Sequence, residues 1–471
     1  MRLSDLIGID SEAAVTGFAI DHRNVAKGNV FGAFRGERFD GESFIPQAVA
    51  SGAVAVVARP EAEVAGAAHI ADPEPRRRFA ELAGRYYAPY PDVIVAVTGT
   101  NGKTSTVEMA RQMWRMAGHR SASIGTLGVT TADEQVRTGL TTPDIVTFLS
   151  NMAGLKRMGI GHVAYEASSH GLDQYRSEGL AVRAAAFTNF SRDHLDYHAD
   201  MDSYFAAKMR LFDEVVEEGG TAVVWTGDAR SADVIEHVRN RGLKLITVGP
   251  GAETIALEEQ VPSPLGQRLV LRYSSRDHKL TLPLIGAYQA NNVLTAAGLL
   301  LATGSEWDET LAAMGRVSPV RGRLERAVIS RAGAPVYVDY AHTADALEAA
   351  IAALRPHVEG KLITVFGAGG DRDAGKRPEM GRVASALSDV AIVTDDNPRT
   401  EDPASIRAEV MQGATGATEI GDRREAIGEA IRLAGAGDII LVAGKGHETG
   451  QIIGERTLPF DDSLVARECA A

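Results

Sequence analysis

Short runs of apolar residues alternate with helix-like stretches along the whole chain. Early in the chain, apolar runs at 29–34 and 53–58 flank a helical pattern at 43–52. Further apolar runs occupy 93–97, 162–165, 184–187, 221–225, 243–248, 336–339, 362–366, 390–394 and 439–443. Such alternation is typical of parallel sheets covered by helices, so the pattern predicts an α/β protein.

Two proline-containing segments divide this pattern into three blocks. The segment 86–92 (YYAPYPD) precedes the run at 93–97, and the segment 318–323 (SPVRGR) precedes the last group of runs. We therefore predict three domains, 1–88, 89–323 and 324–471. This division agrees with about one domain per ~150 residues in a chain of 471 residues.

Charge and composition narrow the classes of partner. The chain has 62 Asp and Glu residues against 49 Lys and Arg residues, a net charge of −13, which argues against nucleic acid or an anionic membrane as the main partner. Its single cysteine, Cys469, excludes a disulfide framework and a cysteine metal site. We see no signal-peptide pattern and no apolar run of ~18 residues. We expect a cytoplasmic protein without a membrane span.

A glycine-rich loop, TGTNGKTS at 98–105, follows the apolar run 93–97 and leads into an amphipathic helical pattern. In this context backbone N–H groups and the helix N-terminus can hold phosphates, Lys103 can reach the terminal phosphates, and the Thr104 hydroxyl can bind Mg²⁺. The strict P-loop pattern would have glycine at Val97, whereas the first glycine here is Gly99. A glycine turn without a ligand is the alternative. We favour a site for a nucleoside triphosphate.

Polar, glycine-containing motifs also follow four apolar runs of the last block: DYAH at 339–342, GAGGDRD at 367–373, DDNPR at 395–399 and GKGHE at 444–448. Because ligands of open α/β sheets bind outside the carboxyl ends of the strands, we predict that these motifs share one cleft. In the middle block Glu166 and His194 follow two further runs. Each could bind Mg²⁺ or Mn²⁺, and each could equally be a structural hydrogen-bonding residue. Spacing alone does not single out Lys208.

These motifs, with EASSHGLDQYR, TNFSRDHLDYH and FGAGGDRDAGKRPEM, occur in the order seen in the Mur ligases, which the chain resembles over essentially its whole length. The resemblance implies an N-terminal uridine-nucleotide domain, a central P-loop ATPase with a mostly parallel sheet, and a C-terminal Rossmann-like domain that binds an amino acid. It implies an ATP- and Mg²⁺-dependent ligase of peptidoglycan precursor synthesis. The expected reaction adds meso-diaminopimelate to UDP-N-acetylmuramoyl-L-alanyl-D-glutamate through an acyl phosphate. We expect a monomer that uses only small-molecule substrates.

The resemblance also assigns roles to residues that match the family motifs. For ATP it implies Gly99, Thr100, Asn101, Gly102, Lys103, Thr104, Ser105, Asn292, Arg323, Asp339 and His342. For the uridine-linked substrate it implies His22, Glu37, Arg38, Phe39, Thr141, Thr142, Ser168, Gln174 and Arg176. For the amino acid it implies Arg372, Asp396, Asn397, Pro398, Arg399, Gly444 and Glu448. For the metal it implies Thr104, Glu166, His194 and a carbamylated Lys208, and for catalysis Lys103, Glu166, His194 and Lys208. His22 departs from the serine that is usual in the family.

Three alternatives to this function differ from it in substrate or in reaction. A ligase of the same family could add L-lysine instead. A nucleotide-driven switch could hydrolyse ATP without ligation. Folylpolyglutamate synthases share the phosphate loop but would not carry both SRDHLDYH and DDNPR. Diaminopimelate has a second amino-acid head, whose carboxylate suits the Arg399 fork and whose ammonium suits Glu448. Lysine would leave Arg399 unpaired, at a cost of ~2–5 kcal/mol, which favours diaminopimelate. Beyond Arg399 we expect Glu401 and Asp402 to form a solvated flank leading into the next helix.

Overall fold

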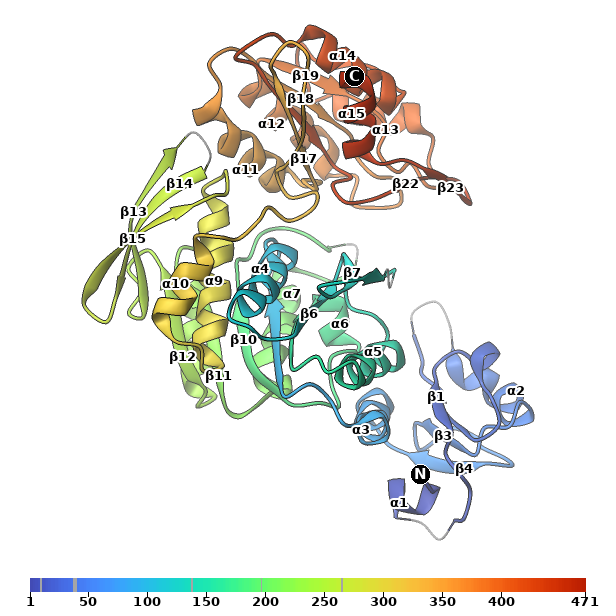
Figure 1. Cartoon of the computed structure of the whole chain (residues 1–471). Helices are drawn as coiled ribbons and strands as arrows, with labels where there is room; N and C mark the ends of the chain where they lie inside the picture. Colours follow the sequence, from blue (N-terminus) through green and yellow to red (C-terminus); the bar gives the residue numbers. More distant parts are fainter. Residues whose placement is uncertain (9–10, 37–39, 137–138, 196, 264–265) are drawn as a thin grey trace.

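The computed structural model describes residues 1–8, 11–36, 40–136, 139–195, 197–263 and 266–471 and has a three-domain α/β fold (Figure 1). The N-terminal sheet is parallel and has the order β1 (Gly17–Ala19), β2 (Asn29–Gly32), β3 (Ala55–Ala58), β4 (Ala68–Ala71). Its helices are α1 (Leu3–Ile7), α2 (Ile45–Ala50) and α3 (Pro75–Tyr87), with short 3₁₀ turns at His22–Asn24 and Gly41–Phe44.

The central sheet has the order β15-β14-β13-β12-β11-β10-β5-β9-β6-β7-β8. Its parallel strands are β5 (Val93–Thr98), β6 (Ser121–Gly125), β9 (His162–Glu166), β10 (Val182–Phe187), β11 (Val216–Trp225) and β12 (Lys244–Gly249). Further strands extend both edges. At one edge β7 (Gly128–Thr130) and β8 (Gln135–Val136) pair antiparallel; at the other, β13 (Ile255–Ser263) pairs parallel with β12 and is followed by the antiparallel strands β14 (Gly266–Tyr273) and β15 (Arg276–Leu282). The helices are α4 (Lys103–Met116), α5 (Ile145–Arg157), α6 (Ser169–Asp173), α7 (Met201–Arg210), a π-helical turn (Leu211–Val215), α8 (Ser231–Asn240), α9 (Tyr288–Ala302) and α10 (Trp307–Met314).

The C-terminal sheet has the order β16-β17-β21-β18-β19-β20. Its strands are β16 (Glu325–Ile329), β17 (Pro335–Asp339), β18 (Leu362–Phe366), β19 (Val390–Val393), β20 (Thr418–Glu419) and β21 (Ile439–Ala443), of which β16 alone pairs antiparallel among the described strands of this sheet. A separate hairpin joins β22 (Gly450–Ile453) to β23 (Arg456–Pro459). The helices are α11 (Ala344–Leu354), a 3₁₀ turn (Arg355–His357), α12 (Lys376–Leu387), α13 (Pro403–Met411), α14 (Arg423–Leu433) and α15 (Asp462–Ala470).

Strand β5 shows why the continuous apolar runs predict the strands correctly. Ile94 and Ala96 lie in one hydrophobic cluster, and Val95 and Val97 lie in a second cluster on the other face. Because side chains alternate across a strand, a strand with helices on both faces is apolar at every position. Each apolar run named above contributes to a strand of the structure. The strands at 255–282 were not predicted, since half of their side chains face water and the apolar runs there are short.

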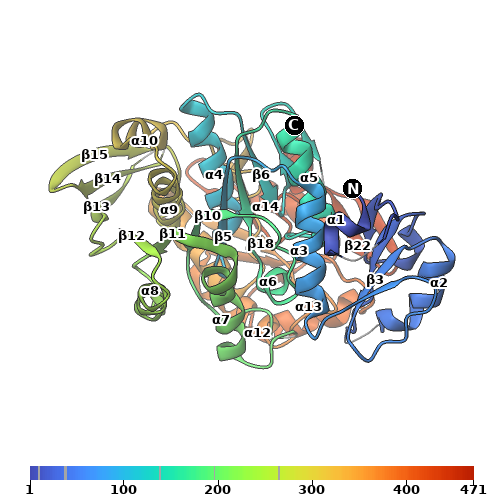
Figure 2. The same ribbon diagram turned by 90° about the horizontal axis from the view of Figure 1, so that it is seen from below.

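Helix α3 connects the first domain to the second, and Figure 2 shows it between the N-terminal sheet and α5. Its Gly84 meets Gly179 of the central domain so closely that a Cβ atom at Gly84 would lie 2.1 Å from the Gly179 carbonyl oxygen. Backbone therefore meets backbone at this contact. The exact domain boundaries remain a prediction. No helix in the described part of the chain is both long and apolar enough to span a bilayer.

Candidate active site

A cavity of about 650 Å³ extends from the loop after β5 to the carboxyl ends of the C-terminal strands. Most of the predicted site residues line it: Thr100, Asn101, Gly102, Lys103, Thr104, Ser105, Thr141, Thr142, Glu166, Ser168, Arg176, His194, Lys208, Asn292, Arg323, Asp339, His342, Arg372, Asp396, Asn397, Arg399, Gly444 and Glu448. Gly99, Gln174, Pro398 and His22 are not in its wall. Glu37, Arg38 and Phe39 lie outside the described residues.

The glycine loop is shaped by close contacts. Gly99 and Gly102 have φ angles of 142° and 84°. A Cβ atom at Gly99 would lie 2.0 Å from the Thr188 hydroxyl, and one at Gly102 would lie 2.5 Å from the Asn292 amide oxygen. Glycine is therefore required at both positions by backbone angle and by space. Helix α4 begins at the next residue, Lys103, so its N-terminal N–H groups point at the cavity.

Two lysines share one carbonyl of this loop. Lys103 Nζ donates to the carbonyl oxygens of Gly99 and Thr100 at 2.8 and 2.7 Å. Lys208 Nζ donates to Gly99 at 2.8 Å and lies 4.2 Å from the centre of the Tyr204 ring. Burial lowers the pKa of both amines, and the neighbouring charge of Lys103 lowers that of Lys208 further, well below its usual value. The Lys208 amine is therefore easily deprotonated, unlike that of a surface lysine.

Glu166 ends β9 and His194 follows β10, the two strands on either side of β5 in the central sheet. Glu166 is the last residue of β9 and accepts hydrogen bonds from the backbone N–H and the hydroxyl of Thr126 at 2.7 and 3.1 Å. His194 follows β10 and has a left-handed backbone, with φ 55°. Burial lowers its pKa, and Lys103 lowers it further, so the ring is neutral at pH 7. A neutral imidazole is the form that ligates metals.

The fit of this site to a magnesium ion can be judged from its donors. No group of three His, Cys, Asp or Glu side chains that could hold a metal occurs within the described residues. Of the residues predicted for the metal, the cavity wall presents the Glu166 carboxylate, the His194 imidazole and the Thr104 hydroxyl. Mg²⁺ commonly takes one or two carboxylates and completes its shell with water and substrate phosphates. The donors fit a magnesium ion that arrives with a nucleotide.

Strands β17, β21, β18 and β19 are neighbours in the C-terminal sheet, and their four polar motifs leave from one edge. All four motifs contribute to the cavity wall, which confirms the predicted shared cleft. Asp339 ends β17 and accepts hydrogen bonds from the N–H groups of Leu324 and Ala341 at 2.7 and 2.9 Å. Burial raises its pKa to about 6. Arg323, from the linker before this domain, donates to the Thr104 hydroxyl at 3.1 Å and so joins both domains at the loop.

The DDNPR motif is held by its neighbours. Arg399 has a left-handed backbone, with φ 52°, and its Nη1 donates to the Gly370 carbonyl oxygen at 2.6 Å. Its N–H donates to Ile452 at 3.0 Å, and the Gly454 N–H donates to its carbonyl oxygen at 2.6 Å. The guanidinium thus has a partner in the protein itself. The predicted cost of leaving it unpaired applies only to its remaining N–H groups.

Glu401, expected to belong to a solvated flank after Arg399, is 35% exposed but also pairs with a buried arginine, which the sequence did not predict. Both of its carboxylate oxygens accept from Arg377, whose side chain is 1% exposed, at 2.8 and 2.9 Å. Its Oε1 also accepts from the N–H of Asp371. Asp402, in contrast, leads into the next helix as expected, because its side chain accepts from the Ser405 N–H and caps α13. A buried arginine far away in sequence explains Glu401, and no local pattern signals it.

The residues predicted for the uridine-linked substrate that the structure describes lie in three places: in the cavity wall, behind it, and in the first domain. Thr142 is bonded to the Glu166 carbonyl oxygen at 2.8 Å and to the Ser168 hydroxyl at 3.0 Å, all in the cavity wall. Arg176 donates to the Gln174 side chain at 2.6 Å, so Gln174 lies behind the wall. His22 lies in the first domain and stacks on Phe44 at 4.2 Å, with 2° between the rings.

Several residues of the wall were missed by the sequence reasoning: Asp193, His170 and Lys376. Each lies within a motif that was recognised, namely SRDH, EASSHGL and GAGGDRDAGKRPEM. Asp193 accepts from the His194 backbone at 2.8 Å. The sequence shows that these residues lie close to a motif. It does not show whether their side chains point into the cavity.

Comparison with known proteins agrees with this geometry. The pattern described as the Mur ligase family, catalytic domain, matches residues 14–95, the Mur ligase middle domain matches 97–300, and the Mur ligase, glutamate ligase domain, matches 322–446. The chain belongs to the Mur ligase family. This Mur ligase is 59% identical over 463 residues, 98% of this chain and 95% of the relative, to the UDP-N-acetylmuramoyl-L-alanyl-D-glutamate–2,6-diaminopimelate ligase of Zymomonas mobilis.

Two further similarities cover the same length. A protein of the same name from Bradyrhizobium diazoefficiens is 48% identical over 98% of this chain and 97% of its own length. A solved structure of a UDP-N-acetylmuramoyl-L-alanyl-D-glutamate–2,6-diaminopimelate ligase is 32% identical, with a TM-score of 0.73, and covers 100% of this chain and 98% of that one. The likeness to this Mur ligase therefore includes all three domains.

Proposed function

We propose that this Mur ligase uses ATP to join meso-diaminopimelate to the D-glutamate carboxylate of UDP-N-acetylmuramoyl-L-alanyl-D-glutamate. One observation carries the proposal: the phosphate loop lines the same cavity as one cationic and one anionic side chain, Arg399 and Glu448. A guanidinium suits a carboxylate, and a carboxylate suits an ammonium. Diaminopimelate carries both groups at the end that does not react. The names of the relatives at 59% and 48% identity support the same substrate.

For ATP we propose that the loop 98–105 and the N-terminus of α4 hold the phosphates. Lys103 would exchange its two loop carbonyls for phosphate oxygens, because a buried ammonium is better paired with an anion than with neutral carbonyls. Arg323, Asp339, His342 and Asn292 would complete the nucleotide site from the linker, the C-terminal domain and α9. Since these contacts come from two domains, ATP would bring them together.

The chemistry then follows in two steps. A carboxylate oxygen of D-glutamate attacks the γ-phosphorus, the bond from that phosphorus to the bridging oxygen breaks, and ADP leaves. The neutral amine of diaminopimelate attacks the acyl carbon of the resulting acyl phosphate. The tetrahedral intermediate loses inorganic phosphate, and the nitrogen loses its proton to give the amide. Lys103 stabilises the charge that moves during the first step, when two anions meet.

We propose Thr104, Glu166, His194 and Lys208 as the residues that hold Mg²⁺. The ion would neutralise phosphate charge. A neutral Lys208 amine can react with carbon dioxide to form a carbamate, an oxygen anion that would suit a cation where an ammonium would repel it. Burial of Lys208 favours the neutral amine that this reaction needs. Native mass spectrometry at neutral pH in bicarbonate should show an added mass of about 44 Da, that of one carbon dioxide, on the wild type and not on Lys208→Ala. Its absence from the wild type under these conditions would contradict the assignment.

We propose the uridine nucleotide for the first domain and the adjoining wall, with Thr141, Thr142, Ser168 and Arg176 toward the muramoyl dipeptide. His22 is stacked on Phe44 and could offer a flat ring beside the nucleotide. The use of ATP and nucleotide-linked substrates suits a cytoplasmic enzyme. For the oligomeric state we propose a monomer.

The experiment is a phosphate-release assay with each co-substrate omitted in turn. We expect release only when ATP, the uridine-linked dipeptide and meso-diaminopimelate are all present, with amide product in equal amount. Release that does not depend on any amino acid would indicate a nucleotide-driven switch. Efficient use of L-lysine in place of diaminopimelate would overturn the substrate assignment.

A further inference from the structure

Lys445 lies between two residues of the proposed amino-acid site, Gly444 and Glu448, but does not line the cavity. Its side chain is 0% exposed. The ammonium donates to Asn397 Oδ1 at 2.9 Å and to Glu448 Oε2 at 3.0 Å. A buried ammonium is costly unless it is paired, so these two contacts hold the side chain in one place. Lys445 therefore connects the DDNPR motif to the GKGHE motif from behind.

The contacts of Asn397 show how firmly this connection is specified. Its Oδ1 accepts from Lys445 and from the Ile452 N–H at 2.9 Å, and its Nδ2 donates to Glu448 Oε2 at 2.8 Å. Rotating the amide by half a turn would put its NH₂ group against two donors. Lys445 and Ile452 together thus determine which end of the Asn397 amide meets Glu448.

The same contacts orient Glu448. Both protein donors that we find for its carboxylate among the described residues, Lys445 and Asn397, bind Oε2. Oε1 is left for a ligand in the cavity, which Glu448 lines. Asp396 lines the same end. Arg423 also lies near these carboxylates, but its charge is balanced by Asp462 at 2.7 Å. The two carboxylates and the Lys445 ammonium then leave one formal negative charge, which complements one ammonium group of a ligand.

We propose that Lys445 is a positioning residue that sets the amino-acid specificity by holding Asn397 and Glu448 as one unit. The inference rests on the proposed function, because it concerns the distal ammonium of the incoming amino acid. Lys445 would not touch the substrate. It would act by fixing the direction of Glu448 and by limiting the negative charge around it.

The test compares Lys445→Met with a control of the same chemistry, Lys361→Met, at an exposed lysine beside the opposite, amino end of β18. For Lys445→Met we expect the KM for diaminopimelate to rise roughly ten-fold to a hundred-fold, from the loss of one or two hydrogen bonds to a charged group. The KM values for ATP and for the uridine-linked dipeptide should stay within about two-fold. Lys361→Met should change none of them. Lys445→Gln keeps one donor, should give an intermediate KM, and serves if the methionine variant does not fold.

A double-mutant cycle distinguishes positioning from bulk stability. If Lys445 acts through Glu448, Lys445→Met should add no more than about two-fold to the KM of Glu448→Gln. Additive effects, or an equal rise of all three KM values, would overturn the inference. A wild-type protein that releases no phosphate with diaminopimelate would instead refute the proposed function, so the two failures are distinguishable.

Discussion

Arg399 shows how a single side chain can be prepared for a ligand by the backbone around it. Its left-handed φ of 52° is unfavourable for arginine by roughly 1–3 kcal/mol. Hydrogen bonds from its N–H to Ile452 and from Gly454 to its carbonyl oxygen hold this conformation. A residue kept in a costly backbone conformation by its surroundings is a frequent feature of binding sites.

Arg399→Ala is therefore expected to weaken use of diaminopimelate far more than binding of the uridine-linked dipeptide. The loss of a two-point contact to a carboxylate should raise the KM for diaminopimelate by about thirty-fold or more. Arg399→Lys keeps the charge but not the fork and should recover only part of the loss. Arg456→Ala, on the exposed strand β23, is the matched control. Steady-state kinetics with each substrate varied in turn measures these effects; equal losses for both substrates would contradict the assignment.

Glu178 provides a second prediction at this scale, about stability and pH. Its side chain is 11% exposed and lies 3.5 Å from Arg210, and burial raises its pKa from 4.5 to about 7. Because the folded state binds the proton more tightly than the unfolded state, this carboxyl lowers stability as pH rises from about 4.5 to about 7. Glu178→Gln should then raise the free energy of unfolding by roughly 1–3 kcal/mol at pH 8 and change it little at pH 4. Thermal melts at both pH values measure it, and equal stabilisation at both would refute the cause given.

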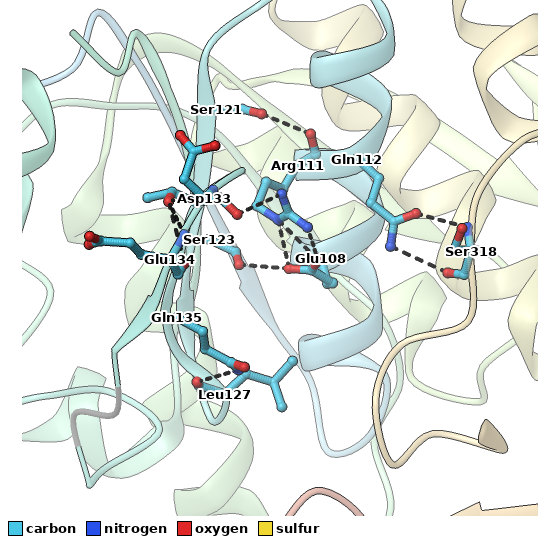
Figure 3. A network of polar contacts seen from close by, with 11 residues as sticks. Glu108, Arg111, Gln112, Ser121, Ser123, Leu127, Asp133, Glu134, Gln135 and Ser318 are labelled. Atoms are coloured by element: carbon cyan, nitrogen blue, oxygen red, sulfur yellow. Dashed lines mark hydrogen bonds and ion pairs between the residues drawn. The ribbon is translucent and has the colours of Figure 1, made fainter. Parts of the chain in front are cut away.

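At the scale of elements, helix α4 joins the phosphate loop to the strands beside it through a buried ion pair. The Arg111 guanidinium pairs with Glu108, and both side chains are 9% exposed (Figure 3). Ser123 of β6 donates to Glu108 at 2.8 Å, and Arg111 donates to the Thr131 carbonyl oxygen at 3.2 Å. The helix that begins at Lys103 is thus bonded to the β6–β7 hairpin, whose Thr126 in turn binds Glu166.

Arg111→Met should destabilise the protein by about 3–5 kcal/mol, because it leaves the Glu108 carboxylate buried without its cation. Glu108→Leu combined with Arg111→Met removes both charges and should recover a large part of that loss. Arg115→Met on the same helix is exposed and should have little effect. Urea denaturation of the wild type and of these three variants measures the free energies of unfolding. A double variant as unstable as Arg111→Met alone would show that lost packing, and not the unpaired charge, is responsible.

The same scale shows what the sequence could and could not predict. Apolar runs predicted the buried strands because both faces of a sheet under helices are dry, and the motifs predicted one cleft because neighbouring parallel strands end at one edge. The strands at 255–282 have one wet face and were missed. The pairing of Glu401 with Arg377 and the left-handed backbone of Arg399 depend on contacts between distant segments. Neither has a local pattern that could have been recognised.

At the scale of the whole molecule, the linker between the second and third domains contacts both. Ser318 exchanges two hydrogen bonds with the Gln112 side chain of α4, at 2.8 and 3.3 Å (Figure 3). Arg323 bonds to Thr104 and lies over the Tyr340 ring at 4.4 Å. Between them, Gly322 meets the GKGHE loop backbone to backbone. The linker therefore relates the position of the amino-acid site to that of the phosphate loop.

Gly322 tests this relation directly. A Cβ atom there would lie 2.2 Å from the His447 backbone nitrogen, and its φ is 66°. Gly333 has a φ of 90° and no atom within 4 Å of its Cβ position. Alanine at 333 therefore has an unfavourable φ, as at 322, but no steric clash. Gly322→Ala should displace the GKGHE loop from the linker and lower the rate of ligation by about a hundred-fold, the effect of an ångström-scale misplacement.

Gly333→Ala should cost about 1 kcal/mol of stability and leave ligation unchanged. Binding of a non-hydrolysable ATP analogue to Gly322→Ala should weaken less than ligation does, because most of the proposed phosphate contacts come from the loop 98–105 of the central domain and only Arg323, beside the substitution, reaches that loop from the linker. Calorimetric titration and the phosphate-release assay measure the two quantities. If both alanine variants ligate equally well, the contact between the linker and the GKGHE loop does not set the geometry of the site. If ligation falls in Gly322→Ala alone, the linker maintains the distance between the phosphate loop and the GKGHE loop.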